Sequence, residues 1–181
     1  MSNKRLSILT PEEIDSIFSC PRFSEDEREY FFTLSKEEKV ELEKFRGHRS
    51  KVYFILQLGY FKARNQFFTF EWNDVQKDRD YIIQKHYYLD NSTEIPAVNT
   101  RSAQQKAILE LLNFRIFDSF SLEKLTETAK SLCKIHIQPR FLFTEMLRIL
   151  ESDQLSLPGY STFQKIISIA ITFETKRLSQ L

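Results

Sequence analysis

One stretch, residues 44–64, constrains the fold of this 181-residue chain more than any other. Residues 52–61 are apolar except for Gln57 and Gly59, and the six Lys or Arg of the stretch lie toward its two ends, with no acid among them. An apolar run this short does not span a bilayer, and a helix that is apolar on nearly every side must be buried in a core. We therefore expect a central buried helix over about residues 49–63, with basic clusters at both ends.

Charge is distributed unevenly around this stretch. Residues 25–43 hold eight Asp or Glu and three Lys or Arg, whereas the whole chain has a formal net charge of only +1. A chain with this balance contacts nucleic acid only through local basic patches. Two interpretations of the basic ends stay open: they hold a polyanion at the rim of a helical core, or they cap the core helix while their aliphatic parts lie along its surface.

Capping sequences mark the helix starts. A capping box has a hydroxyl residue at the N-cap and Glu or Gln three positions later. The pattern occurs at residues 10–13, 24–27, 35–38 and 161–164. Ser121 is predicted to cap another helix, with Phe120 and Leu125 as its hydrophobic staple. Because no stretch has the alternating pattern of a strand, we predict an all-α fold.

The loop-forming residues 90–96 predict a boundary between two small helical subdomains, residues 5–90 and 97–181. In the second subdomain, a helix over about 139–151, a tight loop and a helix over about 161–177 are compatible with a helix-turn-helix. Such a unit reads bases with the first residues of its second helix, here Ser161, Thr162, Gln164 and Lys165. Helical hairpins are common and most bind no DNA, so the pattern alone favours a plain hairpin.

The sequence predicts neither a catalytic site nor a metal site. It has no glycine-rich phosphate loop. Cys133 and His136 have the spacing of one pair of zinc ligands, but zinc needs about four ligands, and Cys20, His48 and His86 have no matching spacing. No nucleophile with a neighbouring His and acid is visible, so we expect a chain that is not an enzyme and holds no cofactor. No apolar segment follows the first residues, which predicts a cytoplasmic protein without membrane contact.

Two ordered sets of motifs resemble a known family. The first set is residues 9–13, 32–35, 46–47 with Arg49, and 54–60; the second is residues 139–143 and 157–163. In this order and spacing they resemble the N-terminal region of the large transposases of the Tn-three family, which move replicative, cointegrate-forming bacterial transposons. The resemblance covers nearly the whole chain.

The resemblance implies an all-helical, two-part region that binds double-stranded DNA at the terminal inverted repeats of a transposon. It also implies a bacterial cytoplasmic protein that is nucleoid-associated when bound. Further partners would be the remaining transposase domains or a second copy of the chain. In such transposases the catalytic carboxylates lie far downstream of this region, in a metal-binding, RNase H-like domain.

With the resemblance, DNA binding becomes the leading hypothesis for the basic residues. They are assigned mainly to phosphates, and the start of the last helix to bases. The full predicted set is Arg46, His48, Arg49, Lys51, Lys62, Arg64, Lys134, His136, Arg140, Ser161, Thr162, Gln164 and Lys165. The alternative is a helical protein-interaction module for transposase dimerisation or regulation, with an aromatic groove near Phe67, Phe68 and Phe70.

Overall fold

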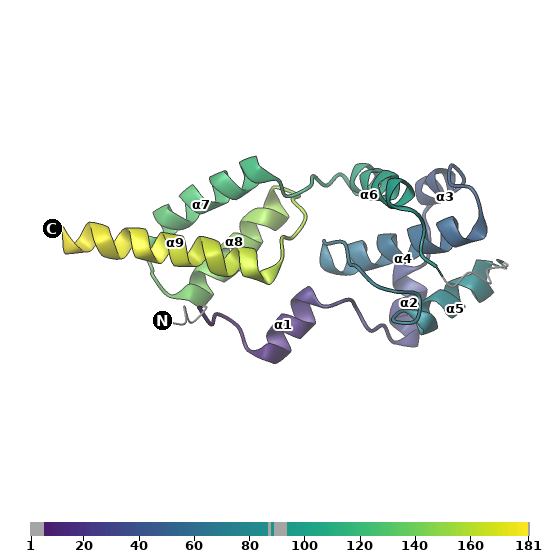
Figure 1. The fold of residues 1–181 in the computed structure, drawn as a ribbon, viewed down its shortest axis with the longest axis horizontal. Helices are drawn as coiled ribbons and strands as arrows, with labels where there is room; N and C mark the ends of the chain where they lie inside the picture. Colours follow the sequence, from purple (N-terminus) through teal and green to yellow (C-terminus); the bar gives the residue numbers. More distant parts are fainter. Residues whose placement is uncertain (1–5, 87, 89–93, 181) are drawn as a thin grey trace. The chain divides into compact units, whose positions relative to one another are not determined.

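The computed structural model describes residues 6–86, 88 and 94–180, and its regular elements there are all helices (Figure 1). This confirms the predicted all-α fold for the described residues. The helices are α1 (Pro11–Phe18), α2 (Glu25–Phe31), α3 (Lys36–Leu42), α4 (His48–Arg64), α5 (Gln76–His86), α6 (Val98–Leu112), α7 (Ser119–Cys133), α8 (Pro139–Ser152) and α9 (Tyr160–Ser179). None of them is long and apolar enough to cross a membrane.

The helices form two compact units, each with its own hydrophobic core. The α4 unit comprises residues 20–114 and contains α2 to α6. The α9 unit comprises α1 with its preceding residues and residues 115–180, which contain α7 to α9. This division differs from the predicted boundary at 90–96, part of which lies outside the described residues. Buried apolar side chains decide the difference: Ile108 of α6 belongs to the core around α4, and Leu9 to the core around α9.

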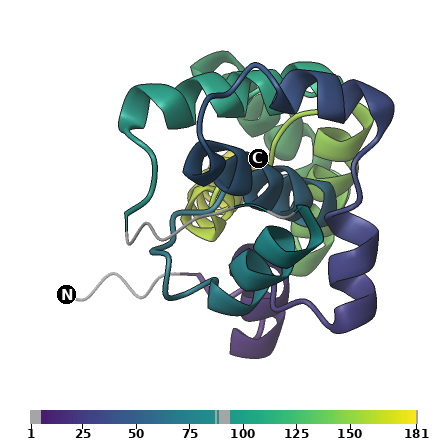
Figure 2. The same cartoon turned by 90° about the vertical axis from the view of Figure 1, so that its right-hand side faces the viewer.

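The buried helix α4 organises its unit. Every residue from Val52 to Phe61 is buried, which confirms the central helix predicted from the apolar run. In Figure 2 the other four helices of this unit surround α4. Gly59 lets the fully buried Phe32 ring pack directly against the backbone of α4. A Cβ at this position would lie 2.5 Å from a ring carbon of Phe32.

The segment that follows α4 contains the three aromatic residues of the predicted protein-binding groove. Phe70 is buried, and Phe67 and Phe68 pack against the core of the α4 unit. Gln57 Nε2 donates to the Phe68 carbonyl over 2.7 Å, which ties the segment to α4. Phe70 therefore belongs to the core, Phe67 and Phe68 are half-buried beside it, and the groove stays a prediction.

Two predicted helix starts are wrong. Helix α7 is capped by Asp118, whose Oδ1 accepts from the Ser121 N–H over 2.8 Å. Phe120 is 70% exposed and therefore does not act as a staple. Helix α9 begins at Tyr160 after Gly159, which has no side-chain cap, so residues 161–164 already lie inside the helix. The boxes at residues 10–13, 24–27 and 35–38 are confirmed, with both reciprocal hydrogen bonds in each.

The extended residues before α1 are fastened to the start of α9. The backbone N–H groups of Ile8 and Leu9 both donate to the Tyr160 hydroxyl, over 3.2 Å and 3.3 Å. Leu9 is buried with side chains of α7, α8 and α9, among them Leu125, Met146 and Phe163. The residues before α1 therefore pack against the first turn of α9.

Candidate nucleic-acid interface

The N-terminus of α4 is chemically unlike the three helix starts before it. Those three carry acids in the first turn and are capped by a side chain. Helix α4 starts after Gly47, which has φ 81 and no side chain to accept from the first-turn N–H groups, and its first turn has no acid. Arg46, His48 and Arg49 are exposed around this end. The helix dipole and the two arginines therefore create a positive potential at this end of α4.

The six cations of the 44–64 stretch do not form a single patch. Lys62 and Arg64 lie in the last turn of α4, and this helix of 17 residues is roughly 25 Å long. The predicted phosphate contacts of this stretch therefore lie at opposite ends of α4. A DNA backbone bound at the N-terminal end would be distant from Lys62 and Arg64 at the other end.

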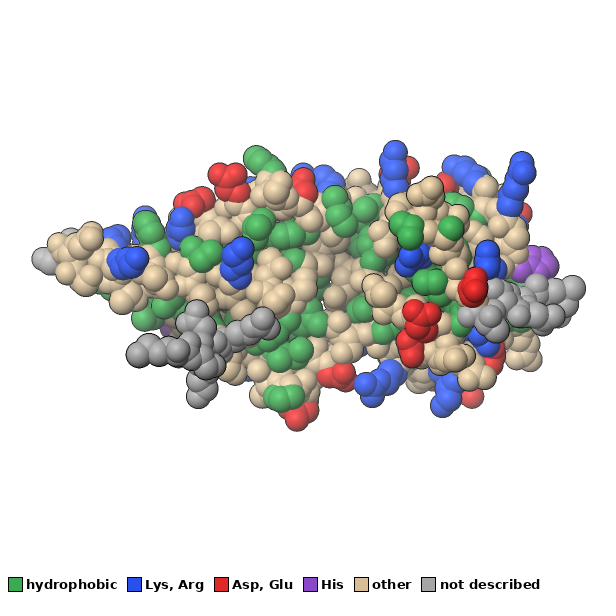
Figure 3. Space-filling view, in the orientation of Figure 1, with side chains coloured by type: hydrophobic (Ala, Val, Ile, Leu, Met, Phe, Trp, Pro, Cys, Tyr) green, Lys and Arg blue, Asp and Glu red, His purple; other side chains and the backbone are tan. Residues whose placement is uncertain are grey.

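Two of these cations already have carboxylate partners from the acidic segment 25–43. Lys51 Nζ lies 2.6 Å from Glu43 Oε2, and Lys62 Nζ lies 2.7 Å from Glu38 Oε1. Glu38 is buried and also accepts from the Ser35 N–H in its capping box, so the Lys62 pair is built into the unit. Basic and acidic side chains accordingly alternate over the α4 unit in Figure 3. A phosphate would have to displace a carboxylate from either lysine.

His48 is part of a three-ring stack. Its ring lies 4.9 Å from that of Tyr88, and the His86 ring lies 5.6 Å from Tyr88, with interplanar angles of 27° and 16°. The stack holds His48 at the start of α4. The pKa of His86 is lowered, first by burial and then by Lys85 and Lys39.

A pH dependence of stability follows from His86. Its pKa in the unfolded chain is near 6.5 and is lower in the folded α4 unit, so the unfolded chain binds the proton more readily. Stability is therefore lost as the pH falls below that value. Between about pH 7.5 and about pH 5.5 we expect the urea midpoint, followed by the fluorescence of the single tryptophan, Trp72, to fall in the wild type and to fall less in His86→Gln. Equal losses in both proteins would contradict this assignment.

The other predicted DNA contacts lie on the α9 unit, and two of them are engaged within it. The Arg140 guanidinium forms a two-pronged ion pair with Glu13 of α1, which lowers the pKa of Glu13 mainly through the hydrogen bond from Arg140. Gln164, predicted to contact a base, donates from Nε2 to the Leu6 carbonyl over 2.7 Å. Neither Glu13 nor Leu6 was expected at this surface, because each lies far from its partner in sequence and no local pattern connects them.

The remaining predicted residues of the α9 unit are mostly exposed. Lys134, Ser161 and Lys165 are exposed, and no hydrogen bond or ion pair joins their side chains to another described residue. Thr162 is half-buried. The exposed His136 ring stacks on Phe141 at 4.9 Å. Each unit therefore retains a few exposed polar or basic side chains, among others that are held by internal contacts.

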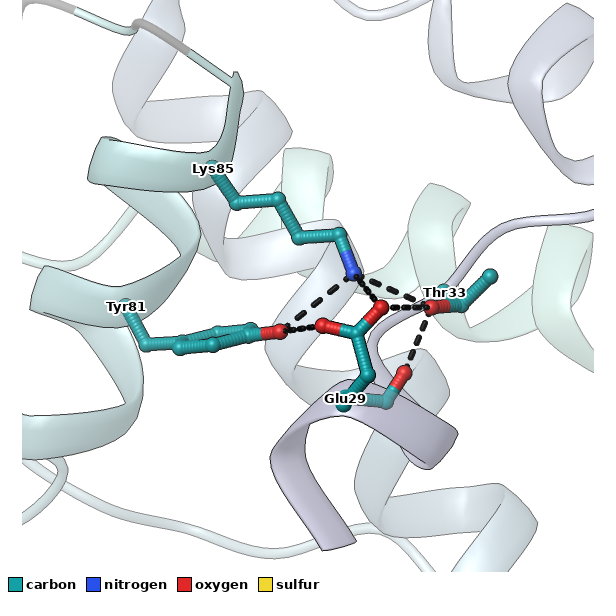
Figure 4. Close-up of polar contacts among 4 residues, drawn as sticks. All are labelled: Glu29, Thr33, Tyr81 and Lys85. Carbon is teal, nitrogen blue, oxygen red and sulfur yellow. Dashed lines mark hydrogen bonds and ion pairs between the residues drawn. The ribbon is translucent and has the colours of Figure 1, made fainter. Parts of the chain in front are cut away.

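A separate polar cluster joins α2 to α5 (Figure 4). Glu29 accepts hydrogen bonds from the Tyr81 hydroxyl and from Lys85 Nζ, and Lys85 also donates to Thr33 Oγ1 over 3.0 Å. Burial and Glu29 raise the pKa of Tyr81. For Lys85 the hydrogen bonds outweigh burial, so its pKa is also raised. Both groups keep their protons at neutral pH. The cluster therefore links α2 to α5 through hydrogen bonds and an ion pair.

The thiols and possible metal ligands of the residues that the structure describes give no further site. Burial, assisted by Asp78, raises the pKa of Cys20 to about 12, so this residue remains a thiol. Cys133 is buried in the core of the α9 unit. Within the described part of the chain, no group of three or more His, Cys, Asp or Glu is placed to hold a metal ion.

Comparison with known proteins gives a family for the chain. A family model described as "Domain of unknown function (DUF4158)" matches residues 8–170. No curated protein matches the chain at a significant level. The family match begins in the segment fastened to Tyr160 and ends within α9, so it includes residues of both units. Because it covers most of the 181 residues, the chain belongs to the DUF4158 family.

Proposed function

We propose that the chain binds double-stranded DNA and recognises the terminal inverted repeats of a transposon as the N-terminal part of a transposase. The main support is the N-terminus of α4, where Arg46, His48 and Arg49 are exposed and the helix has neither a side-chain cap nor an acid in its first turn. Backbone N–H groups and cations together bind phosphate well. The transposase part of the proposal rests on the ordered motifs that resemble the Tn-three family.

The internal contacts narrow the set of residues for this role. Lys51, Lys62 and Arg140 are paired with carboxylates, and Gln164 is bonded to a carbonyl. We assign the phosphate contacts of the α4 unit chiefly to Arg46, which is exposed beside Gly47 at the start of α4. In the α9 unit, Lys134, Ser161 and Lys165 are the best placed, because their exposed side chains form no hydrogen bond or ion pair with another described residue. Phosphate contacts would set the affinity, and base contacts the sequence preference.

The variant Arg46→Ala tests the α4 part of the proposal. A residue that contacts phosphate releases counterions on binding, so its loss should weaken binding to all duplexes about equally. We expect the plot of log affinity against log salt concentration to become less steep by about 1 in Arg46→Ala. Fluorescence anisotropy with a labelled duplex measures this slope.

Lys106→Ala is the matched control for this variant. Lys106 is also a cation of the α4 unit, with a side chain 81% exposed, but it lies on α6 and its Nζ is 4.0 Å from Glu110 Oε1. We expect its salt dependence to match that of the wild type. A slope unchanged in Arg46→Ala, or reduced equally in both variants, would contradict a phosphate site at the start of α4.

A further inference from the structure

One face of α9 exposes apolar side chains beside lysines. Ile169 is 39% exposed and Phe173 is 47% exposed. Between α7 and α9 the surface is hollowed into a shallow cavity of about 380 Å³, which we call the α9 hollow. Its lining is Lys130, Ser168, Ile169, Thr172, Phe173 and Lys176. In Figure 3 the visible face of α9 carries both apolar and basic side chains.

The lining of the α9 hollow selects for an apolar group that carries negative charge. Its charged residues are the two lysines, and no carboxylate lines it. Lys130 Nζ lies 5.0 Å from the centre of the Phe173 ring, which places a cation over an aromatic floor, although it also bonds Glu127 Oε1 at the edge. An aromatic side chain flanked by carboxylates would meet both the apolar floor and the basic rim.

Helix α2 of the same chain presents a group of this kind. Tyr30 is 77% exposed, although it is a large aromatic residue. Asp26 and Glu27 lie four and three positions earlier, so all three side chains share one face of the helix. Glu27 is used in the capping box with Ser24, whereas Asp26 is exposed and forms no ion pair with another described residue. Tyrosines in such positions are frequent anchors of protein interfaces.

We propose that the α9 hollow of one copy of the chain binds Tyr30 of a second copy, with Asp26 facing the lysine rim. The charge complementarity of the two surfaces is the argument for this occupant. Because the hollow and Tyr30 are different surfaces, each contact joins unlike patches of the two copies. A contact of one short helix buries less than about 1,200 Å² in total, so the association is weak and depends on concentration. It needs no DNA and does not rest on the proposed function.

Sedimentation of the full chain without DNA tests this contact with two variants at exposed positions. Tyr30→Ala removes the anchor, and Ile169→Asp places a carboxylate in the hollow. We expect the average mass of the wild type to rise with concentration. Each variant alone should associate at least about tenfold more weakly than the wild type. An equimolar mixture should recover association, because each variant supplies the surface that the other lacks. That mixture should stop at a dimer, since only one intact contact remains.

Val98→Ala is the control, because Val98 is 63% exposed on α6 and takes no part in the contact. It should associate as the wild type does, and circular dichroism should show all variants folded. A wild type that stays monomeric at every concentration would overturn the proposal. The hollow would then have another occupant, such as α2 of the same chain or DNA. Wild-type association in Tyr30→Ala, or a mixture that fails to recover, would overturn it equally.

Discussion

Replacing Asp78 by alanine is expected to destabilise the α4 unit by about 3–5 kcal/mol. Asp78 Oδ1 lies 2.7 Å from Arg28 Nε, and Oδ2 accepts from the Tyr60 hydroxyl over 2.6 Å. The side chains of Arg28 and Asp78 are only 15% and 7% exposed. Loss of the carboxylate leaves a mostly buried guanidinium without a counter-charge and a buried hydroxyl without an acceptor. Urea unfolding followed by Trp72 fluorescence measures the loss.

The neighbouring residue Asp80 provides a control on the same helix. Its side chain is 56% exposed and lies 3.4 Å from Arg79, so Asp80→Ala should change the stability by less than about 1 kcal/mol. Replacing Arg28 by leucine in the Asp78→Ala background should recover part of the loss, because it removes the unpaired charge. Similar losses of stability in the two aspartate variants would show that the buried Arg28–Asp78 pair stabilises the unit no more than the exposed pair does.

The second large effect is expected at Gly59, which lies in the buried centre of α4. In Gly59→Ala the added Cβ would lie 2.5 Å from a ring carbon of Phe32 and 3.2 Å from the Phe31 carbonyl oxygen. Alanine favours a helix over glycine by about 1 kcal/mol, which acts in the opposite direction. The fully buried Phe32 ring also contacts Phe23, Tyr60 and Tyr81, so it cannot move without disturbing them. We expect a net loss of about 2 kcal/mol in the Trp72 transition.

Gly159→Ala is the matched control for this substitution. Nothing lies within 4 Å of a Cβ at Gly159, and the residue has φ −64, which alanine adopts readily. It belongs to the α9 unit, so it should leave the Trp72 transition unchanged and alter helix α9 by about 1 kcal/mol or less. A Gly59→Ala protein as stable as the wild type would mean that Phe32 does not pack so tightly against α4.

Local patterns predicted the fold class and most helices. The apolar run of residues 52–61 is decisive, because a helix apolar on every side has only one stable place, the core. The capping boxes at Thr10, Ser24 and Ser35 were also predictable, since both partners of each box lie within four residues. Signals of this kind are complete within one turn of helix and do not depend on the rest of the chain.

Predictions failed where several local signals compete. Asp118 caps α7 in place of Ser121, since a carboxylate three residues earlier also accepts well from a backbone N–H. Gly159 precedes α9 in place of Ser161, which lets Tyr160 lie in the first turn and accept from Ile8 and Leu9. In both cases the helix starts earlier than its most obvious hydroxyl residue.

Long-range contacts explain why the candidate site was only partly predictable. Arg140 and Glu13 are separated by 127 positions, and Gln164 and Leu6 by 158. A local pattern of residue types cannot indicate such pairs. The sequence-based prediction therefore assigned Arg140 and Gln164 to DNA, although both have partners within the chain. The acidic segment 25–43 had a similar effect, because its carboxylates meet Lys51 and Lys62 only after α3 packs on α4.

The central claim is that a few cations around Gly47, with exposed side chains of the α9 unit, bind the backbone of a duplex. The most direct measurement is a fluorescence-anisotropy titration of the wild type at rising salt, with a duplex of the proposed terminal inverted repeat and a scrambled duplex of equal length. The account predicts that affinity falls steeply with salt for both duplexes and is higher for the inverted repeat. An affinity that is independent of salt, or equal for the two duplexes, would contradict it.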